Sequence, residues 1–288
     1  MLDYPERTSS KQPLVPGPIG LFDSGYGGLT ILSEIKQLMP QYDYLYLGDN
    51  SRAPYGPRSF DVIYEFTRQA VFALFDKGCN LIVLACNTAS AKALRTIQQV
   101  DLPKVAPQKR VLGIIRPTAE IVGNLTQTRH VGIFGTLGTI QSESYLLEIN
   151  KLFPDIQVVG EACPIWVPLV ENGKANSDGA DFFIKENIDS LLKKDPNIDA
   201  VILGCTHYPL LYDKIRRYLP KHIRLISQGS YIAKSLEDYL RRHPEIDAVC
   251  IKEGSTNYLT TESPERFQEN SSLFLNEKIN VEKIALDR

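Results

Sequence analysis

Leu81-Ile-Val-Leu-Ala-Cys-Asn-Thr88 is an apolar run of strand length that ends in a thiol, an amide and a hydroxyl. Val201-Ile-Leu-Gly-Cys-Thr-His207 repeats this form in the second half of the chain. Two earlier runs, Ile19-Gly-Leu-Phe22 and Val131-Gly-Ile-Phe134, match each other at a similar interval, and each precedes a turn of small and polar residues. Short apolar runs bounded in this way predict buried parallel strands, and their repetition predicts two similar units.

The rest of the chain alternates such runs with amphipathic stretches of helical length, which is typical of an α/β protein with mainly parallel sheets. We predict two similar α/β domains with the active site in the cleft between them. Residues 19–115 plus about 225–288 are expected to form the first domain, and residues 116–224 the second. The Pro-rich residues 1–18 are expected to be a disordered arm.

The expected strands are Ile19–Phe22, Tyr44–Leu47, Leu81–Ala85, Val111–Ile115, Val131–Phe134, Gln157–Val159, Ala200–Leu203 and Arg224–Ile226. The expected helices are Leu29–Leu38, Ser59–Lys77, Ala89–Gln99, Gln141–Leu152, Gly179–Lys194, Leu210–Tyr218 and Tyr231–Arg241.

The composition excludes several classes of protein. The 288 residues include 32 Lys and Arg against 34 Asp and Glu, a formal net charge of −2, so neither nucleic acid nor an anionic membrane is indicated as a partner. A hydrophobic fraction of 43% is that of a folded protein. No apolar run approaches the length of a membrane span, and no secretory signal is evident, so we expect a cytoplasmic location. The five cysteines include no C-x-x-C pair, so neither a disulfide framework nor a metal site is expected.

Four strand-to-helix turns carry the candidate chemistry, because ligands of α/β sheets bind beyond the carboxyl ends of the strands. They begin at Asp23, Cys86, Gly135 and Cys205. A single buried cysteine is more often a small hydrophobe than a reactive group. Two cysteines at matching positions of two units, each at a helix N-terminus that favours the thiolate, reverse that expectation. His207 shares its turn with Cys205 and could exchange a proton with it.

Two thiols on opposite sides of a cleft suit the inversion of a stereocentre. One group removes the α-proton from one face of the substrate, and the other returns a proton to the opposite face. Because the reaction runs from L to D and from D to L, it needs two acid/base groups of similar acid strength. Paired cysteines supply them. Preorganised donors and exclusion of water must then stabilise the carbanion-like state.

The motifs of this chain resemble those of the glutamate racemases, within the aspartate/glutamate racemase superfamily. The matching segments occur in the family's order over about residues 19–240. They are Phe22-Asp-Ser-Gly-Tyr-Gly-Gly28, Leu47-Gly-Asp-Asn-Ser-Arg-Ala-Pro-Tyr-Gly56, Ala85-Cys-Asn-Thr-Ala89, Gly135-Thr-Leu-Gly-Thr139, Ala162-Cys-Pro164 with Val167-Pro-Leu-Val-Glu171, and Gly204-Cys-Thr-His-Tyr-Pro209.

The resemblance implies a cofactor-independent interconversion of L- and D-glutamate that supplies D-glutamate for peptidoglycan, in an enzyme that is a homodimer. Cys205 matches the base that acts on L-glutamate and Cys86 the base that acts on D-glutamate. Asp23 and His207 match groups that assist the thiols, and Glu171 a carboxylate that supports the histidine. The implied substrate-binding residues are Asp23, Ser24, Tyr55, Gly56, Asn87, Thr88, Thr139, Thr206 and His207.

Two departures from the family pattern are Ser227-Gln-Gly229, where many relatives have an acidic residue first, and Arg116, which lies in a segment that varies. The arm at residues 1–18 resembles extensions of members that respond to a cell-wall precursor. The alternatives are an aspartate racemase and a protein that binds an acidic amino acid without catalysis. A role in contacting another protein, as some glutamate racemases do with DNA gyrase, is a further alternative.

Overall fold

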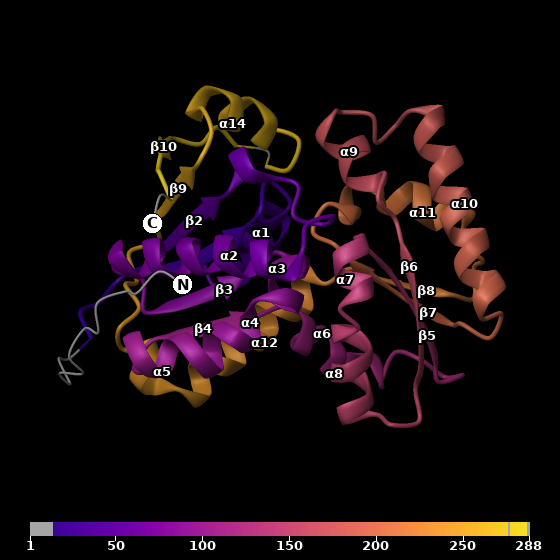
Figure 1. Cartoon of the computed structure of the whole chain (residues 1–288), viewed down its shortest axis with the longest axis horizontal. Helices are drawn as coiled ribbons and strands as arrows, with labels where there is room; N and C mark the ends of the chain where they lie inside the picture. The colour runs from indigo at the N-terminus through magenta and orange to yellow at the C-terminus, as the bar shows by residue number, and fades with distance from the viewer. Residues whose placement is uncertain (1–13, 276, 287–288) are drawn as a thin grey trace.

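In the computed structural model, which describes residues 14–275 and 277–286, the chain forms two parallel sheets (Figure 1). The first sheet has six strands in the order β10-β9-β2-β1-β3-β4, and all its neighbouring strands run parallel. Its strands are β1 (Ile19–Asp23), β2 (Tyr44–Gly48), β3 (Leu81–Leu84), β4 (Arg110–Gly113), β9 (Thr256–Thr260) and β10 (Val281–Lys283).

The second sheet has four parallel strands in the order β6-β5-β7-β8. They are β5 (His130–Gly135), β6 (Gln157–Ala162), β7 (Ala200–Gly204) and β8 (Arg224–Ile226). The order β2-β1-β3-β4 of the first sheet thus recurs as β6-β5-β7-β8. The predicted α/β fold with two similar, mainly parallel sheets is confirmed, and the repeated sequence runs occupy equivalent strands.

Helices cover both faces of each sheet, so each sheet lies between two apolar layers. The longer helices are α1 (Gly28–Leu38), α2 (Phe60–Asp76), α6 (Ile115–Val122), α8 (Ser144–Leu152), α10 (Asp178–Lys194), α12 (Gly229–Arg242) and α14 (Pro264–Ser271). The shorter ones are α3 (Asn87–Lys92), α4 (Leu94–Thr96), α5 (Leu102–Val105), α7 (Leu137–Gln141), α9 (Trp166–Glu171), α11 (Tyr212–Tyr218) and α13 (Pro244–Asp247), with the turns η1 (Asn50–Arg52), η2 (Ile97–Asp101) and η3 (Tyr208–Leu211).

In the first unit, α1 and α12 pack on one face of the sheet, while α2 and α3 pack on the other. In the second unit, α9, α10 and α11 cover one face, and α6 and α8 the other. Trp166 is fully buried among aromatic rings of this second core, with its ring centroid 4.9 Å from those of Phe134 and Tyr208.

Several elements differ from the sequence-based expectation. The strand expected to end at Ile115 ends at Gly113, and Ile115 instead opens α6, where Pro117 fits the first turn because that turn needs no N–H from it. The helix expected at Ala89–Gln99 is broken into α3, α4 and the π-turn η2. The strands β9 and β10 were not expected, because neither has the apolar alternation that marks a strand.

The expected disordered arm is wrong for residues 14–18, while residues 1–13 lie outside the described residues. The backbone N–H of Gly17 donates to the Val249 carbonyl (3.0 Å), and the N–H of Ile251 donates to the Gly17 carbonyl (3.0 Å). Asn80 Nδ2 also donates to the Val15 carbonyl (2.7 Å). The backbone groups of the non-proline residues Val15 and Gly17 thus attach the segment to the first unit.

The chain passes from the first sheet to the second through α6 and returns after β8. α12 then packs against α1, and β9 pairs with β2. We therefore propose a domain division with one boundary inside α6 and the other after Ile226, close to the positions 115 and 225 expected from the sequence.

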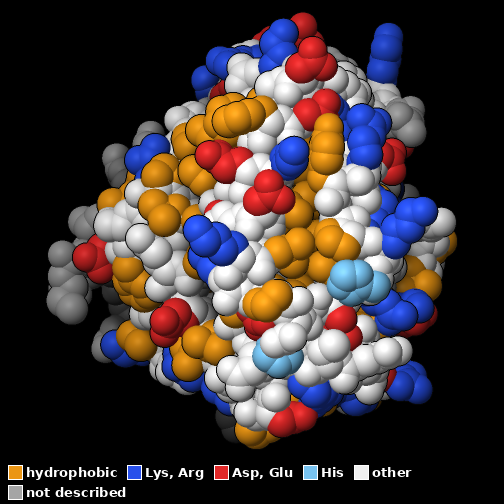
Figure 2. All heavy atoms as spheres, turned by 90° about the vertical axis from the view of Figure 1, so that its right-hand side faces the viewer, with side chains coloured by type: hydrophobic (Ala, Val, Ile, Leu, Met, Phe, Trp, Pro, Cys, Tyr) orange, Lys and Arg blue, Asp and Glu red, His pale blue; other side chains and the backbone are white. Residues whose placement is uncertain are grey.

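The surface carries mixed charge. On the face of the second unit in Figure 2, basic and acidic side chains are interspersed and no broad area of one sign is visible. Within residues 14–275 and 277–286, no helix combines the length and the apolar character needed to cross a membrane.

Candidate active site

The two sheets lie side by side (Figure 1), and polar side chains that follow their strands are in contact between the units. The hydroxyl of Thr206, after β7, donates to Asp23 Oδ2 at the end of β1 (3.3 Å). The hydroxyls of Thr88, after β3, and Thr136, after β5, are 2.9 Å apart. The backbone also crosses this boundary, because Gly138 N donates to the Gly56 carbonyl (2.9 Å). The four turns predicted from the sequence therefore lie together.

Cys86 lies at the N-cap of α3 in the first unit. Its Sγ accepts a hydrogen bond from the Ala89 N–H (3.4 Å) and lies 3.5 Å from Ser24 Oγ, to which the thiol can donate. Burial is the largest cause that raises the pKa of this thiol, the charge of Asp23 adds to it, and the pKa rises to about 12. At neutral pH Cys86 is therefore a protonated thiol, which can donate a proton.

Cys205 lies at the end of β7 in the second unit, beside a histidine. Its Sγ is 3.9 Å from His207 Nδ1, and His207 Nε2 is 3.0 Å from Glu171 Oε1. Burial lowers the pKa of His207, but its hydrogen bonds with Cys205 and Glu171 raise the pKa more, to about 10. The imidazole is therefore a cation at neutral pH, and a cation beside a sulfur stabilises negative charge on it.

Asp23 occupies the centre of the site and has no exposed surface. Its Oδ1 accepts the Gly25 N–H (2.8 Å), and its Oδ2 accepts the Thr206 hydroxyl. Burial raises the pKa of this carboxyl, and the nearby charge of His207 offsets only part of that rise. Asp23 thus interacts with both thiol-bearing units and can take up a proton more readily than an exposed aspartate.

Hydroxyl and amide groups surround the thiols. Thr88, Thr136 and Thr139 form a triad in which the hydroxyl oxygens are 2.9 to 3.3 Å apart. Asn87 is buried and hydrogen-bonds to Tyr145 and Gln228. These neutral donors suit the carboxylate oxygens of a small acidic ligand, since a hydroxyl can turn its proton toward whichever acceptor is present.

The structure brings together nearly all of the site residues that the sequence predicts, with one difference in orientation. The hydroxyl of Tyr55 is hydrogen-bonded to Asp49, which also accepts from Arg52 Nε (2.7 Å) and from the Thr261 hydroxyl (2.9 Å). Tyr55 therefore helps to fix the loop before Gly56 against β9.

Four side chains near the site were not predicted. Thr136 belongs to a quoted motif and could have been found there as a helix N-cap. Tyr145 and Gln228 hydrogen-bond to the site residue Asn87 and to each other. Phe274 packs edge-on against the His207 ring, with centroids 5.6 Å apart, and no local pattern marks it.

Metal ligation is not supported by the arrangement of acidic, cysteine and histidine side chains. In the part of the chain that the structure describes, no group of three or more such side chains could hold an ion.

Comparisons with known proteins agree on one family. Residues 29–236 match the Asp/Glu/Hydantoin racemase family. The chain is 40% identical over 274 residues to a glutamate racemase of Ruegeria sp. (strain TM1040), covering 92% of this chain and 98% of that protein. It is 38% identical over 270 residues to a glutamate racemase of Streptococcus agalactiae (serotype III, strain NEM316), covering 93% and 98% of the two chains.

Solved structures give the same result. A glutamate racemase of Bacillus anthracis superposes with a TM-score of 0.85 at 33% identity, covering 94% of this chain and 98% of that one. One of Francisella tularensis, solved with D-glutamate, has a TM-score of 0.83 at 33% identity, with 94% and 98% covered. One of Escherichia coli, solved with L-glutamate and the activator UDP-MurNAc-Ala, has a TM-score of 0.73 at 28% identity, with 94% and 99% covered.

Gly27 offers a direct test of how closely the two units must approach. A Cβ built at Gly27 would overlap both the Thr206 hydroxyl oxygen and His207 Nδ1. We expect Gly27→Ala to displace this turn and to lower kcat/KM by about 100-fold, the order of loss that follows a misplacement of about 1 Å. Steady-state kinetics of the purified variant measures the change.

Gly179→Ala is the matched control, because the nearest atom to a Cβ there is Ser177 Oγ at 3.7 Å, an ordinary contact. That variant should keep the wild-type rate. Equal activity of the two variants would contradict the close approach at Gly27.

Proposed function

The chain belongs to the Asp/Glu/hydantoin racemase family and is an amino-acid racemase, and on that premise we propose that it interconverts L- and D-glutamate without a cofactor, by proton transfer between Cys86 and Cys205. The observation that carries this proposal is the placement of two buried thiols after equivalent strands of two repeated units. The names of the relatives support glutamate as the substrate, and two of the similar solved structures contain D-glutamate or L-glutamate.

In the proposed reaction, the Cys205 thiolate removes the α-proton of L-glutamate and becomes a thiol. The electron pair of the broken C–H bond stays on the substrate as a carbanion-like state. This pair then forms a new C–H bond with the proton of the Cys86 thiol on the opposite face. D-glutamate results, with Cys86 as the thiolate, and the reverse reaction follows the same steps in the opposite order. Each thiol is an acid in one direction and a base in the other.

The different surroundings of the thiols support a starting state suited to L-glutamate. The raised pKa keeps Cys86 protonated, while the His207–Glu171 pair places a cation beside Cys205. Asp23 interacts with both sides, and we propose that it helps to return a proton to Cys86 or to remove one. We assign His207 the same task at Cys205, with Glu171 holding its imidazole.

We propose that neutral donors hold the substrate. The assigned donors are Ser24, Asn87, Thr88, Thr139 and Thr206 and the backbone at Gly56, which Tyr55 holds in place through Asp49. The titratable groups Asp23 and His207 complete the assigned set. Hydroxyl and amide donors can follow the negative charge as it spreads from the α-carbon into the carboxylate. Since they are already fixed in a largely dry site, they require little rearrangement during the reaction.

We further propose that the product supplies D-glutamate for peptidoglycan and that the protein acts in the cytoplasm as a homodimer. The first proposal is supported by the Escherichia coli relative, whose activator is UDP-MurNAc-Ala. Neither nucleic acid nor a membrane is proposed as a partner, in keeping with the net charge of −2.

Removal of either thiol tests the two-cysteine assignment. We expect Cys86→Ser and Cys205→Ser each to lower racemisation of L-glutamate by about 10²–10⁴-fold, because a positioned acid or base contributes that much. Circular dichroism follows the racemisation. In D₂O, Cys86→Ser should still exchange the α-proton of L-glutamate without inversion, because Cys205 remains, and NMR detects this exchange.

Cys250→Ser is the control, since Cys250 is buried at a distance from the site and donates to the Ile246 carbonyl. The control should racemise glutamate at the wild-type rate. Near-normal racemisation by Cys86→Ser or Cys205→Ser would refute the assignment. Faster turnover of L-aspartate than of L-glutamate by the wild type would instead refute the assignment of glutamate as the substrate.

Glu171→Gln tests the histidine pair through pH. The carboxylate of Glu171 raises the pKa of His207, so the neutral amide should let that pKa fall from about 10. If the imidazolium is the active form, the decline of kcat/KM at alkaline pH should begin at a lower pH in the variant. The substrate titrates in the same way with both enzymes. A difference between their alkaline declines of kcat/KM therefore comes from a group of the enzyme.

Glu120→Gln serves as the control for this prediction, because Glu120 pairs with Arg116 on the surface. Its alkaline decline should coincide with that of the wild type. A decline in Glu171→Gln that is unchanged, or moved to higher pH, would contradict the proposed role of the pair.

A further inference from the structure

We propose that Gln228 is a positioning residue that holds the two thiol-bearing units in register, through a closed ring of hydrogen bonds with Asn87 and Tyr145. Gln228 lies in the Ser227-Gln-Gly229 segment and forms the N-cap of α12. This role rests on the proposed function, since it concerns the geometry of the same site.

The ring joins three buried side chains from three elements. Asn87 Nδ2 donates to Gln228 Oε1 (3.0 Å), Gln228 Nε2 donates to the Tyr145 hydroxyl oxygen (2.5 Å), and the Tyr145 hydroxyl donates to Asn87 Oδ1 (2.6 Å). Gln228 Nε2 also donates to Thr118 Oγ1 (2.8 Å), whose hydroxyl donates to the Ile114 carbonyl (3.0 Å). The four side chains are at most 3% exposed.

The donors and acceptors of the ring allow one orientation of each amide. Gln228 Nε2 uses both of its N–H bonds, and its Oε1 must face Asn87. The Tyr145 hydroxyl accepts from Gln228, so its single proton goes to Asn87 Oδ1. Asn87 therefore keeps one N–H bond uncommitted and fixed in direction, which is what a donor to a substrate carboxylate requires.

The ring touches both halves of the site. Asn87 follows Cys86 directly in the first unit. In the second unit, the Tyr145 ring packs against the residue before Cys205, because a Cβ built on Gly204 would lie 3.3 Å from Tyr145 Cε2. Burial and the charge of Cys205 both raise the pKa of Tyr145. A displacement in the ring would therefore move one thiol relative to the other.

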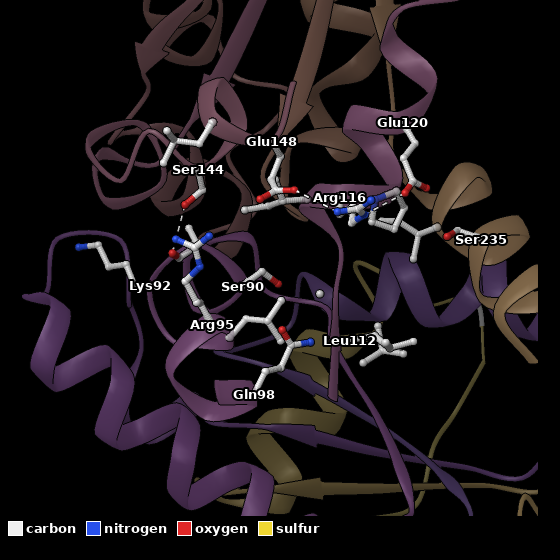
Figure 3. Close-up of a pocket in the computed structure, with 18 of the residues that line it drawn as sticks. Ser90, Lys92, Arg95, Gln98, Leu112, Arg116, Glu120, Ser144, Glu148 and Ser235 are labelled. Carbon is white, nitrogen blue, oxygen red and sulfur yellow. Dashed lines mark hydrogen bonds and ion pairs between the residues drawn. The ribbon is translucent and has the colours of Figure 1, made fainter. Parts of the chain in front are cut away.

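A cavity of about 630 Å³ is bordered by the helices that the ring connects. Its walls come mainly from α3, α4, α6, α8 and α12 (Figure 3). In this view Ser90 of α3, Ser144 of α8, Arg116 of α6 and Ser235 of α12 border the open space. The hydrogen-bonded side chains come from four of these helices. Asn87 lies in α3, Thr118 in α6 and Tyr145 in α8, and Gln228 caps α12.

Ser90, Ala91 and Lys92 of α3 line this cavity. The ring adds directional contacts beside the open space, and such bonds are strong in a buried, low-dielectric setting. A further hydrogen bond between the two units near the cavity runs from the Ser144 hydroxyl to the Ala91 carbonyl (3.1 Å).

The test is Gln228→Met, which keeps the length of the side chain and removes every hydrogen bond. We expect kcat for L-glutamate to fall about 10- to 100-fold, while KM changes much less, because the N–H that Asn87 presents matters most when negative charge spreads into the substrate carboxylate during the reaction. In an Asn87→Ala background the same substitution should cause little further loss of kcat, because Gln228 acts through Asn87. Gln98→Met, which removes a hydrogen bond to the Val111 carbonyl, is the matched control with wild-type activity.

Tyr145→Phe is the second variant in case Gln228→Met does not fold, since it removes only a hydroxyl, and it should also lower kcat more than KM. Wild-type kcat in either variant, or an equal loss from Gln228→Met with and without Asn87, would overturn the positioning role. If the wild type racemises glutamate and Gln228→Met has the same kcat, the positioning role is refuted and the proposed function stands. A wild type that does not racemise glutamate refutes the proposed function as well.

Discussion

The structure depends on a constraint at the boundary of its two units, where buried polar groups must find their partners across the boundary. Asp23, Thr88, Thr206 and His207 lie at or just after the carboxyl ends of strands in the two parallel sheets, and all are less than 5% exposed. A buried polar group without a partner is costly. In this structure, polar groups of one unit hydrogen-bond to polar groups of the other, as when the Thr206 hydroxyl donates to Asp23. Gly27 allows this approach because it has no side chain.

The two thiols at this boundary have chemically different surroundings. The units are repeats of one strand order, yet Cys86 has a serine and a nearby aspartate, whereas Cys205 has a histidine paired with a glutamate. Burial and negative charge keep the first as a thiol, while a cation lies beside the second. The proposed two-thiol mechanism needs one acid and one base at the start of each turnover, and this difference is consistent with that need.

The sequence predicts the features that depend on local pattern. The eight expected strands exist within a few residues, because apolar runs between glycines and polar turns mark buried strands. Cys86, Cys205 and His207 are predicted as site residues because each follows such a run. β9 was missed because its residues alternate weakly, and its place is decided by pairing with β2, far away in the sequence. Gln228 and Tyr145 were missed because their partners lie across the boundary of the units, and no spacing along the chain encodes such a contact.

The most direct test of the account is the position of deuterium early in the reaction. The protein is equilibrated in D₂O with a thiol reductant and no cofactor, L-glutamate is added, and the reaction is stopped after a small conversion. NMR and separation of the enantiomers then locate the label. The account predicts that the D-glutamate formed carries deuterium at the α-carbon, because Cys86 delivers a solvent-derived deuteron, while the remaining L-glutamate keeps its proton. D-glutamate that retains the original α-proton would show that one group carries it between the faces, which would contradict the two-thiol mechanism.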